Sequence, residues 1–186
     1  VGFSEKRLAE VAHKQMLKLP YYHTFSSKAH EPSIRLAEKL AEMTPEPLTR
    51  AFFTSSGTEA NDTIVKMVWY MNNALGRPKK KKFLSRIKGY HGITVASGSL
   101  TGLPINHRDF DLPAIPVHHL TCPHFYRFGA EGEDEGAFTA RLLAELETVI
   151  ATEGADSIAA FIGEPLMAAG GVMPPPVGYW EGVERI

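Results

Sequence analysis

Two short apolar runs separated by one long amphipathic segment constrain the fold of this chain more than any other feature. The first run covers residues 51–53 and the second covers residues 83–87. Between them, apolar residues recur at helical spacing as far as Leu75, and Gly76 and Pro78 then predict the end of a helix. Two strands joined by one helix form a right-handed unit whose strands are parallel. The pattern therefore predicts an α/β fold, with helices on the faces of a mostly parallel sheet.

Other segments extend this prediction on both sides. Helices are expected over residues 4–19, with Ser4 as the cap, and over residues 36–43, with an aromatic loop between them. Helical spacing over residues 138–150, closed by Gly154, predicts another helix. The small apolar residues 157–163 predict a strand that is buried on both faces, and a last helix should begin near Tyr179.

The composition restricts the class of partner. Of the 186 residues, 44% are hydrophobic and 22% are charged, which is typical of a soluble globular protein. Twenty basic and 21 acidic residues leave a formal charge of −1, so neither nucleic acid nor a membrane is expected as a partner. No apolar run approaches the roughly 20 residues that span a bilayer. The single cysteine, Cys122, fits a reducing compartment, and we expect a cytoplasmic protein.

The two ends of the sequence suggest a piece of a longer chain. The sequence begins at Val1 rather than at a methionine, and it stops at Ile186 inside a predicted helix. We therefore expect truncation at both ends, with a processed or trimmed protein as the alternative.

The junction of residues 55–58 is the first candidate site. The first turn of a helix leaves backbone amides without partners and carries a partial positive charge, so it stabilises a phosphate. Gly57 would let an anion approach the backbone, and the hydroxyls of Ser56 and Thr58 could add hydrogen bonds. A helix cap without a ligand is the alternative, because Ser and Thr cap many helices. The lysine of a P-loop and the spacing of a dinucleotide-binding motif are both missing.

Three segments together resemble the class III aminotransferases, which use pyridoxal 5′-phosphate (PLP). Residues 54–62, TSSGTEAND, look like the phosphate-binding turn of that family; residues 89–92, GYHG, and residues 163–165, GEP, follow in the same order. The resemblance covers essentially the whole chain. It is closest to the amine:pyruvate, or ω-transaminase, branch, through residues 60–63, 119–124 and 169–172.

The resemblance implies part of the PLP-dependent transferase fold of type I. Residues 1–47 would be a segment of helices and an aromatic loop that leads into the large domain, and residues 48–186 would be the N-terminal part of that PLP-binding α/β domain. The parent protein would be a homodimer.

The resemblance also implies roles for individual residues. Ser56, Gly57 and Thr58 would hold the PLP phosphate. Tyr90 would lie on the face of the pyridine ring and contact the substrate, although a core aromatic residue is the alternative. His91 would be a hydrogen-bonding group behind the cofactor.

Three further residues complete the set of expected site residues. Gly92 would permit close backbone packing. Glu164 would lie in the polar shell around the cofactor, at the carboxyl end of a strand, or would cap a loop. Phe25 would enter the small substrate pocket, with a dimer-interface contact as the alternative.

Two catalytic residues of the family have no counterpart in this sequence. In the family, a lysine that forms a Schiff base with PLP and an aspartate on the pyridine nitrogen both come after the Glu-Pro segment. No lysine here matches that motif. We therefore expect the parent protein to be a transaminase and this chain by itself to be inactive.

The substrates follow from a departure from the family pattern. In the ornithine and γ-aminobutyrate branch, the Glu-Pro segment is followed by a glutamine and then by a glutamate that neutralises a substrate-binding arginine. Met167 and Ala169 stand at those positions here. The difference predicts an amine or ω-amino acid as donor and a 2-oxo acid such as pyruvate, rather than 2-oxoglutarate, as acceptor.

Three alternatives remain open from the sequence. A zinc site could use the cluster of residues 118–124, which contains three histidines and Cys122, although the spacing fits a tetrahedral site poorly. A non-catalytic module could bind a phosphate ligand at residues 56–58 alone. An aminomutase or a decarboxylase could use PLP on the same scaffold.

Overall fold

The computed structural model describes residues 2–186, which divide into two compact units at Phe53 and Thr54. The boundary that the sequence suggested between residues 47 and 48 stays a prediction. Within residues 2–186, no helix combines the length and the apolar character that crossing a membrane requires.

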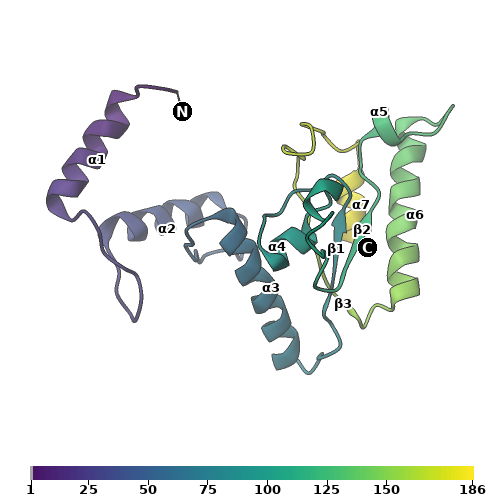
Figure 1. Ribbon diagram of the computed structural model, residues 1–186, viewed down its shortest axis with the longest axis horizontal. Coiled ribbons are helices and arrows are strands. Elements are labelled where there is room, and N and C mark those ends of the chain that lie inside the picture. Colours follow the sequence, from purple (N-terminus) through teal and green to yellow (C-terminus); the bar gives the residue numbers. More distant parts are fainter. Residues whose placement is uncertain (1) are drawn as a thin grey trace. The chain divides into compact units, whose positions relative to one another are not determined.

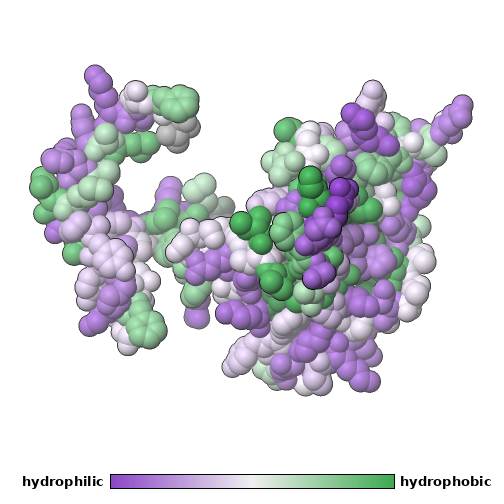
Figure 2. All heavy atoms as spheres, viewed as in Figure 1, coloured by the Kyte–Doolittle hydropathy of each residue, from purple (hydrophilic) through white to green (hydrophobic). Residues whose placement is uncertain are grey.

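The first unit contains two helices, α1 (Lys6–Lys18) and α2 (Glu31–Met43). Both were predicted, but the carboxylate of Glu5 caps α1 in place of Ser4, because Ser4 adopts a left-handed backbone with φ of 60°. None of residues 2–53 is buried within this unit. Figure 2 shows hydrophobic side chains in green among hydrophilic ones in purple on its surface.

The strand expected at residues 51–53 is not formed. Phe52 and Phe53 are exposed, and these residues pair with no strand among residues 2–186. An apolar run becomes a strand only where a neighbouring strand satisfies its backbone groups, and no such neighbour is available here. The strand-helix-strand motif predicted for residues 51–87 is therefore wrong in its first strand.

The second unit contains a parallel sheet of three strands in the order β2-β1-β3. The bounds are β1 (Lys82–Arg86), β2 (Val117–Leu120) and β3 (Ile158–Phe161). β1 is the central strand; it places Phe83 opposite Val117 of β2 and opposite Ala160 of β3. The predicted α/β class with a parallel sheet is thus confirmed, although β2 was not predicted.

Helices cover both faces of this sheet (Figure 1). On one face, Phe83 packs with Val65 of α3 (Gly57–Ala74) and Leu100 of α4 (Val95–Leu100). On the other face, Leu84 packs with Leu120 and with Leu146 of α6 (Glu135–Glu153). Successive residues of β1 therefore face opposite layers, as the alternation of side chains along a strand requires. The helices are α3 (Gly57–Ala74), α4 (Val95–Leu100), the short 3-10 helix η1 (Pro104–Asn106), α5 (Phe125–Phe128), α6 (Glu135–Glu153) and α7 (Tyr179–Arg185).

The helix ends agree with the sequence, whereas the burial of β3 does not. α3 ends at its C-cap Leu75 and is followed by Gly76 with φ of 70°; α6 is followed by Gly154 with φ of 81°. β3 is only half-buried, because it pairs on one side with β1 and lies at the edge of the sheet.

Candidate cofactor-binding site

The carboxyl ends of the three parallel strands bring distant loops together. The loop after β3 carries Glu164, whose Oε1 accepts a hydrogen bond from the backbone N–H of Tyr90 at 2.8 Å, in the loop after β1. Its Oε2 accepts one from the N–H of Ala168 at 3.1 Å. Glu164 therefore fastens two loops at the edge where open α/β sheets bind ligands. These contacts match the loop-capping alternative, and its place in a polar shell around a cofactor stays a prediction.

The start of α3 leaves two backbone donors available. The Ser56 hydroxyl accepts from the N–H of Glu59 at 3.1 Å, so this side chain caps the helix. The N–H groups of Gly57 and Thr58 find no acceptor among residues 2–186. Helix N-termini with free amides bind anions, and the partial positive charge of the helix dipole adds to the attraction.

The loop that contains His91 and Gly92 is held against this end of α3. Asn61 Nδ2 donates to the His91 carbonyl at 2.6 Å. Asp62 Oδ1 accepts from the Thr94 hydroxyl at 2.6 Å and from the Ser97 N–H at 2.9 Å. These polar side chains on α3 were quoted above only as part of the family pattern, and the structure gives them a positioning role.

Gly92 allows the loop to approach α3 closely. Its φ is 134°, a conformation that favours glycine, and a Cβ placed on it would lie 2.8 Å from Thr58 Oγ1 and would collide with the Ser97 side chain. Thr58 and Gly92, which are far apart in sequence, thus lie next to each other, as a site formed by both segments requires.

Arg86, at the end of β1, is a buried charge that the sequence did not single out. Only 1% of this residue is exposed, and its guanidinium lies 4.7 Å from the ring centroid of Trp180. Its Nη2 donates to the Glu164 carbonyl at 2.6 Å. Nε and Nη1 are buried without a hydrogen-bond partner among residues 2–186. Arg86 therefore supports the loop of Glu164. The available signal in the sequence was a charged residue at the end of an apolar strand.

His91 belongs to this loop, and its imidazole is buried and kept neutral. It is 6% exposed, and its Nε2 has no partner in the described part of the chain. Burial lowers the pKa of its imidazole to about 4; the charge of Arg86 adds to the decrease, and Glu164 opposes it. A neutral imidazole at pH 7 fits the expected hydrogen-bonding role better than that of a cation.

The other predicted residues fall into two groups. Ser56 and Gly57 are exposed, and Tyr90 is 38% exposed, so a ligand in solvent could contact all three. Phe25 belongs to the first unit, in the loop between α1 and α2, where it is 80% exposed. Its role in a substrate pocket stays a prediction.

The residues of the alternative zinc site have other partners. His118 Nδ1 lies 3.5 Å from Glu153, and His119 Nε2 lies 3.2 Å from the Leu100 carbonyl. Cys122 is buried against Met167 and Met173. Among residues 2–186, no three His, Cys, Asp or Glu side chains are arranged to hold a metal ion.

The residues at the start of α3 fit a phosphate group. Gly57 has an ordinary backbone conformation, and a Cβ built on it would meet nothing within 4 Å. Neither strain nor packing within this chain therefore requires a glycine there. A glycine that leaves the backbone bare beside two free amides fits a ligand that must approach them closely.

Comparison with known proteins identifies the family of the chain. The family model for aminotransferase class-III matches residues 1–186. The chain is 52% identical to the mitochondrial gamma aminobutyrate transaminase 1 and 54% identical to the chloroplastic gamma aminobutyrate transaminase 3 of Solanum lycopersicum; each match covers 100% of the chain and 36% of the relative. The structure of the omega transaminase from Pseudomonas jessenii in complex with PMP matches 99% of the chain and 41% of that protein, with 62% identity and a TM-score of 0.96.

The chain thus spans between a third and a half of the length of these proteins. Because the family match extends over every residue of the sequence, the chain belongs to the class III aminotransferases, which are PLP-dependent enzymes.

Proposed function

We propose that the intact protein containing this chain transfers an amino group from an amine or ω-amino acid to a 2-oxo acid such as pyruvate, with PLP as cofactor. The observation that carries this proposal is the pair of free amides at Gly57 and Thr58, next to the loop of Tyr90, His91 and Gly92. The similarity to transaminases over the whole chain supports it.

The residues of this chain would bind and orient the cofactor. PLP supplies an electron sink for the bonds at the reacting carbon of the substrate. The amides of Gly57 and Thr58, with the Thr58 hydroxyl, would hold its phosphate, and Ser56 would keep the helix start in shape. Tyr90 would pack against the pyridine ring of PLP. Glu164 holds the Tyr90 backbone and would keep this side chain in place.

His91, Gly92 and Phe25 would act around this binding site. Neutral His91 would offer its unpaired Nε2 as a hydrogen-bonding group, and Gly92 would keep the loop close to Thr58. Phe25 would contribute to the substrate pocket. The chain by itself would not turn over, since the family's lysine and aspartate have no counterpart in it.

The acceptor follows from the loop after Glu164. Met167 is buried against Cys122 and Met173, whereas Ala169 is exposed and carries no charge. Without a carboxylate at this position, the site would favour pyruvate over 2-oxoglutarate. The names of the tomato relatives identify γ-aminobutyrate, an ω-amino acid, as the donor of those proteins, which is compatible with the proposed donor class.

The assembly and the compartment are proposed from the sequence. A homodimer follows from the family resemblance. A cytoplasmic location rests on the single cysteine, while the tomato relatives are mitochondrial and chloroplastic proteins. Size-exclusion chromatography with light scattering and imaging of the tagged intact protein would test the two points.

Phosphate binding is tested with Gly57→Val in the intact protein. A valine would meet no protein atom near its Cβ but would stand between the phosphate and the amides, so PLP should bind at least about tenfold more weakly. Pyridoxal, which lacks the phosphate, is the matched ligand and should bind both proteins equally. Equal PLP affinity of the two proteins, measured by titration of the cofactor absorbance, would remove this site.

The substrate class is tested separately by steady-state kinetics. The intact protein should use pyruvate with a higher kcat/KM than 2-oxoglutarate, with an ω-amino acid as the donor. A preference for 2-oxoglutarate would overturn the acceptor while leaving the phosphate site intact.

A further inference from the structure

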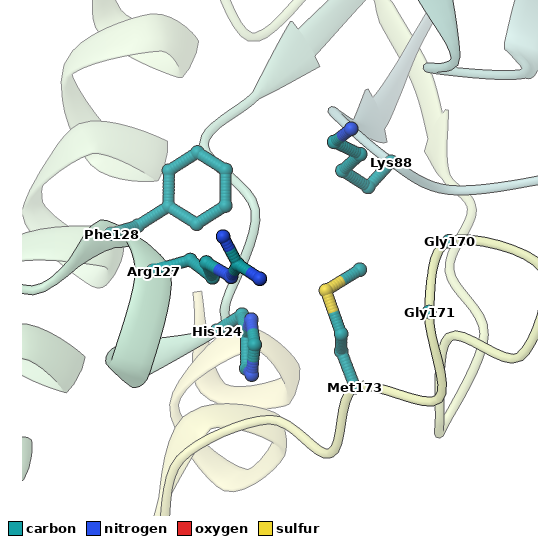
Figure 3. A pocket seen from close by; sticks show the side chains of 7 residues that line it. All are labelled: Lys88, His124, Arg127, Phe128, Gly170, Gly171 and Met173. Carbon is teal, nitrogen blue, oxygen red and sulfur yellow. The ribbon is translucent and has the colours of Figure 1, made fainter.

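The loop after β1 begins with two residues that the main chain holds in place. The Lys88 N–H donates to the Gly102 carbonyl at 2.8 Å, and the Gly102 N–H donates to the Gly89 carbonyl at 2.8 Å. Lys88 and Gly170 line the same pocket of about 460 Å³ (Figure 3). They pack so closely that a Cβ at residue 170 would collide with the Lys88 carbonyl. Backbone contacts therefore fix the start of the loop.

Residues 90–92 are held by side chains instead. No backbone group among residues 2–186 pairs with their N–H groups or carbonyls. Glu164 accepts from the Tyr90 N–H, and Asn61 donates to the His91 carbonyl. Each contact restrains one peptide plane, but a side chain keeps its direction only when the planes on both sides of its Cα are fixed.

Thr101 holds the two peptide planes that these contacts leave free. Its hydroxyl accepts from the His91 N–H at 2.9 Å, which fixes the plane that follows Tyr90. The same hydroxyl donates to the Gly92 carbonyl at 3.0 Å, which fixes the plane that follows Gly92. One buried oxygen thus completes the restraint of the backbone at Tyr90 and at Gly92.

The single proton of this hydroxyl has two acceptors within reach. The Ser97 carbonyl lies 3.2 Å away, but it already accepts from the Thr101 N–H at 3.1 Å. The Gly92 carbonyl is closer, and it has no other donor in the described part of the chain. The bond to Gly92 is therefore the one that the loop needs.

Thr101 itself is held firmly. It is 0% exposed and forms the C-cap of α4. The next residue, Gly102, lies against the end of β1, where a Cβ would collide with the Arg86 carbonyl. Loss of the hydroxyl would leave the His91 N–H and the Gly92 carbonyl buried without a partner.

We propose that Thr101 is a positioning residue of the cofactor site, which sets the direction of the Tyr90 ring by fixing the peptide plane behind it. The inference rests on the proposed function, because it takes Tyr90 to pack on the pyridine ring of PLP. Thr101 would therefore act on the ring of the cofactor, whereas Gly57 would act on its phosphate.

Titration of the intact protein with PLP and with pyridoxal, which lacks the phosphate, tests this inference. Thr101→Val removes the hydroxyl and should weaken the binding of both ligands about tenfold. Thr101→Ser keeps the hydroxyl and should bind both within about twofold of the unmodified protein. Thr101→Ala, with the same expected loss, replaces the valine variant if that variant does not fold. Unchanged pyridoxal affinity without the hydroxyl would overturn the inference.

Thr139→Val is the matched control. Thr139 is 7% exposed, and its hydroxyl also lies near two carbonyls, those of Glu135 at 3.0 Å and Val177 at 3.1 Å. This variant makes the same chemical change in α6 and should leave both affinities unchanged. An equal loss in Thr139→Val would show a general loosening of the fold and would overturn the positioning role.

A double-mutant cycle with Tyr90→Ala separates positioning from general support. If Thr101 acts through the Tyr90 ring, Thr101→Val should have no further effect on pyridoxal affinity once that ring is removed. A tenfold loss in both backgrounds would contradict the inference.

Hydrogen exchange of the intact protein without cofactor gives a readout that does not depend on the proposed function. The His91 amide should exchange about tenfold faster in Thr101→Val than in the unmodified protein or in Thr139→Val. Unchanged exchange would remove the basis of the inference. If Gly57→Val loses PLP affinity while Thr101→Val keeps it, the inference fails and the proposed function stands. If the unmodified protein binds no PLP, the proposed function fails, whatever the exchange at His91.

Discussion

His91 couples the loop after β1 to the protonation state of the protein. Its imidazole is buried, and the pKa near 4 lies below the value of about 6.5 that is usual for an unfolded chain. Between these two values the unfolded state binds a proton that the folded state does not bind. The stability that His91 contributes is therefore complete above about pH 6.5 and is lost as the pH falls toward 4.

Replacing His91 by glutamine should flatten the dependence of stability on pH. The unmodified chain should lose up to about 1.4 kcal/mol of its free energy of unfolding per pH unit through this group, or about 3 kcal/mol across the window. Urea unfolding at several values between pH 7 and pH 4 would measure the slope for both proteins. The exposed His13→Gln is the control and should keep the original slope. Identical slopes for the unmodified chain and His91→Gln would contradict the assignment.

At the scale of elements, the loop of residues 89–92 and the start of α3 depend on two glycines for different reasons. Gly92 is required by its φ of 134° and by the contact with Thr58, whereas Gly57 has open space around it. Gly92→Ala should lower the free energy of unfolding by about 3 kcal/mol, because it combines backbone strain with a steric collision.

Gly57→Ala is the matched control for this prediction. It should leave stability unchanged or raise it by up to about 1 kcal/mol, since alanine favours a helix more than glycine does. Chemical denaturation of the two variants would compare them. A similar loss in both, or no loss in Gly92→Ala, would show that the loop does not depend on this close approach.

The elements that could be predicted from the sequence are those with local signals. The ends of α3 and α6 follow from Gly76 and Gly154, because a left-handed residue after a helix is a property of the chain itself. The prediction of a strand at residues 51–53 was wrong, because a strand needs a neighbouring strand to pair with, and a short stretch of sequence does not show whether one is present.

Two further features could not be predicted from the sequence. The strand β2 was missed because half of its four residues are His118 and His119, which have little strand preference. For the candidate site, the turn of residues 55–58 was visible in the sequence. The contacts of Glu164 with Tyr90 and Arg86 were not, because they join residues more than 70 positions apart.

At the scale of the whole molecule, the two units differ in how they are stabilised. The second unit has apolar clusters on both faces of its sheet, whereas no residue between 2 and 53 is buried within the first. Local opening should therefore need much less free energy in the first unit than in the second.

Limited proteolysis of the 186-residue chain would measure this difference. Trypsin should cut first after Lys28 and Arg50, in connections of the first unit, and should leave a resistant product that begins near Ala51. Arg86 of β1 is buried and should be cut last. Mass spectrometry at early times would identify the products, and initial cleavage after Arg108 or within β1 would contradict the prediction.

The grip of Glu164 on the main chain of Tyr90 has a consequence for engineering. Because the carboxylate recognises a peptide N–H that every residue except proline offers, the ring at position 90 can be exchanged for another aromatic or aliphatic group without releasing the segment that carries it. If Tyr90 meets the substrate as proposed, libraries at position 90 could alter the choice of amine while the Glu164 contact keeps the loop in place.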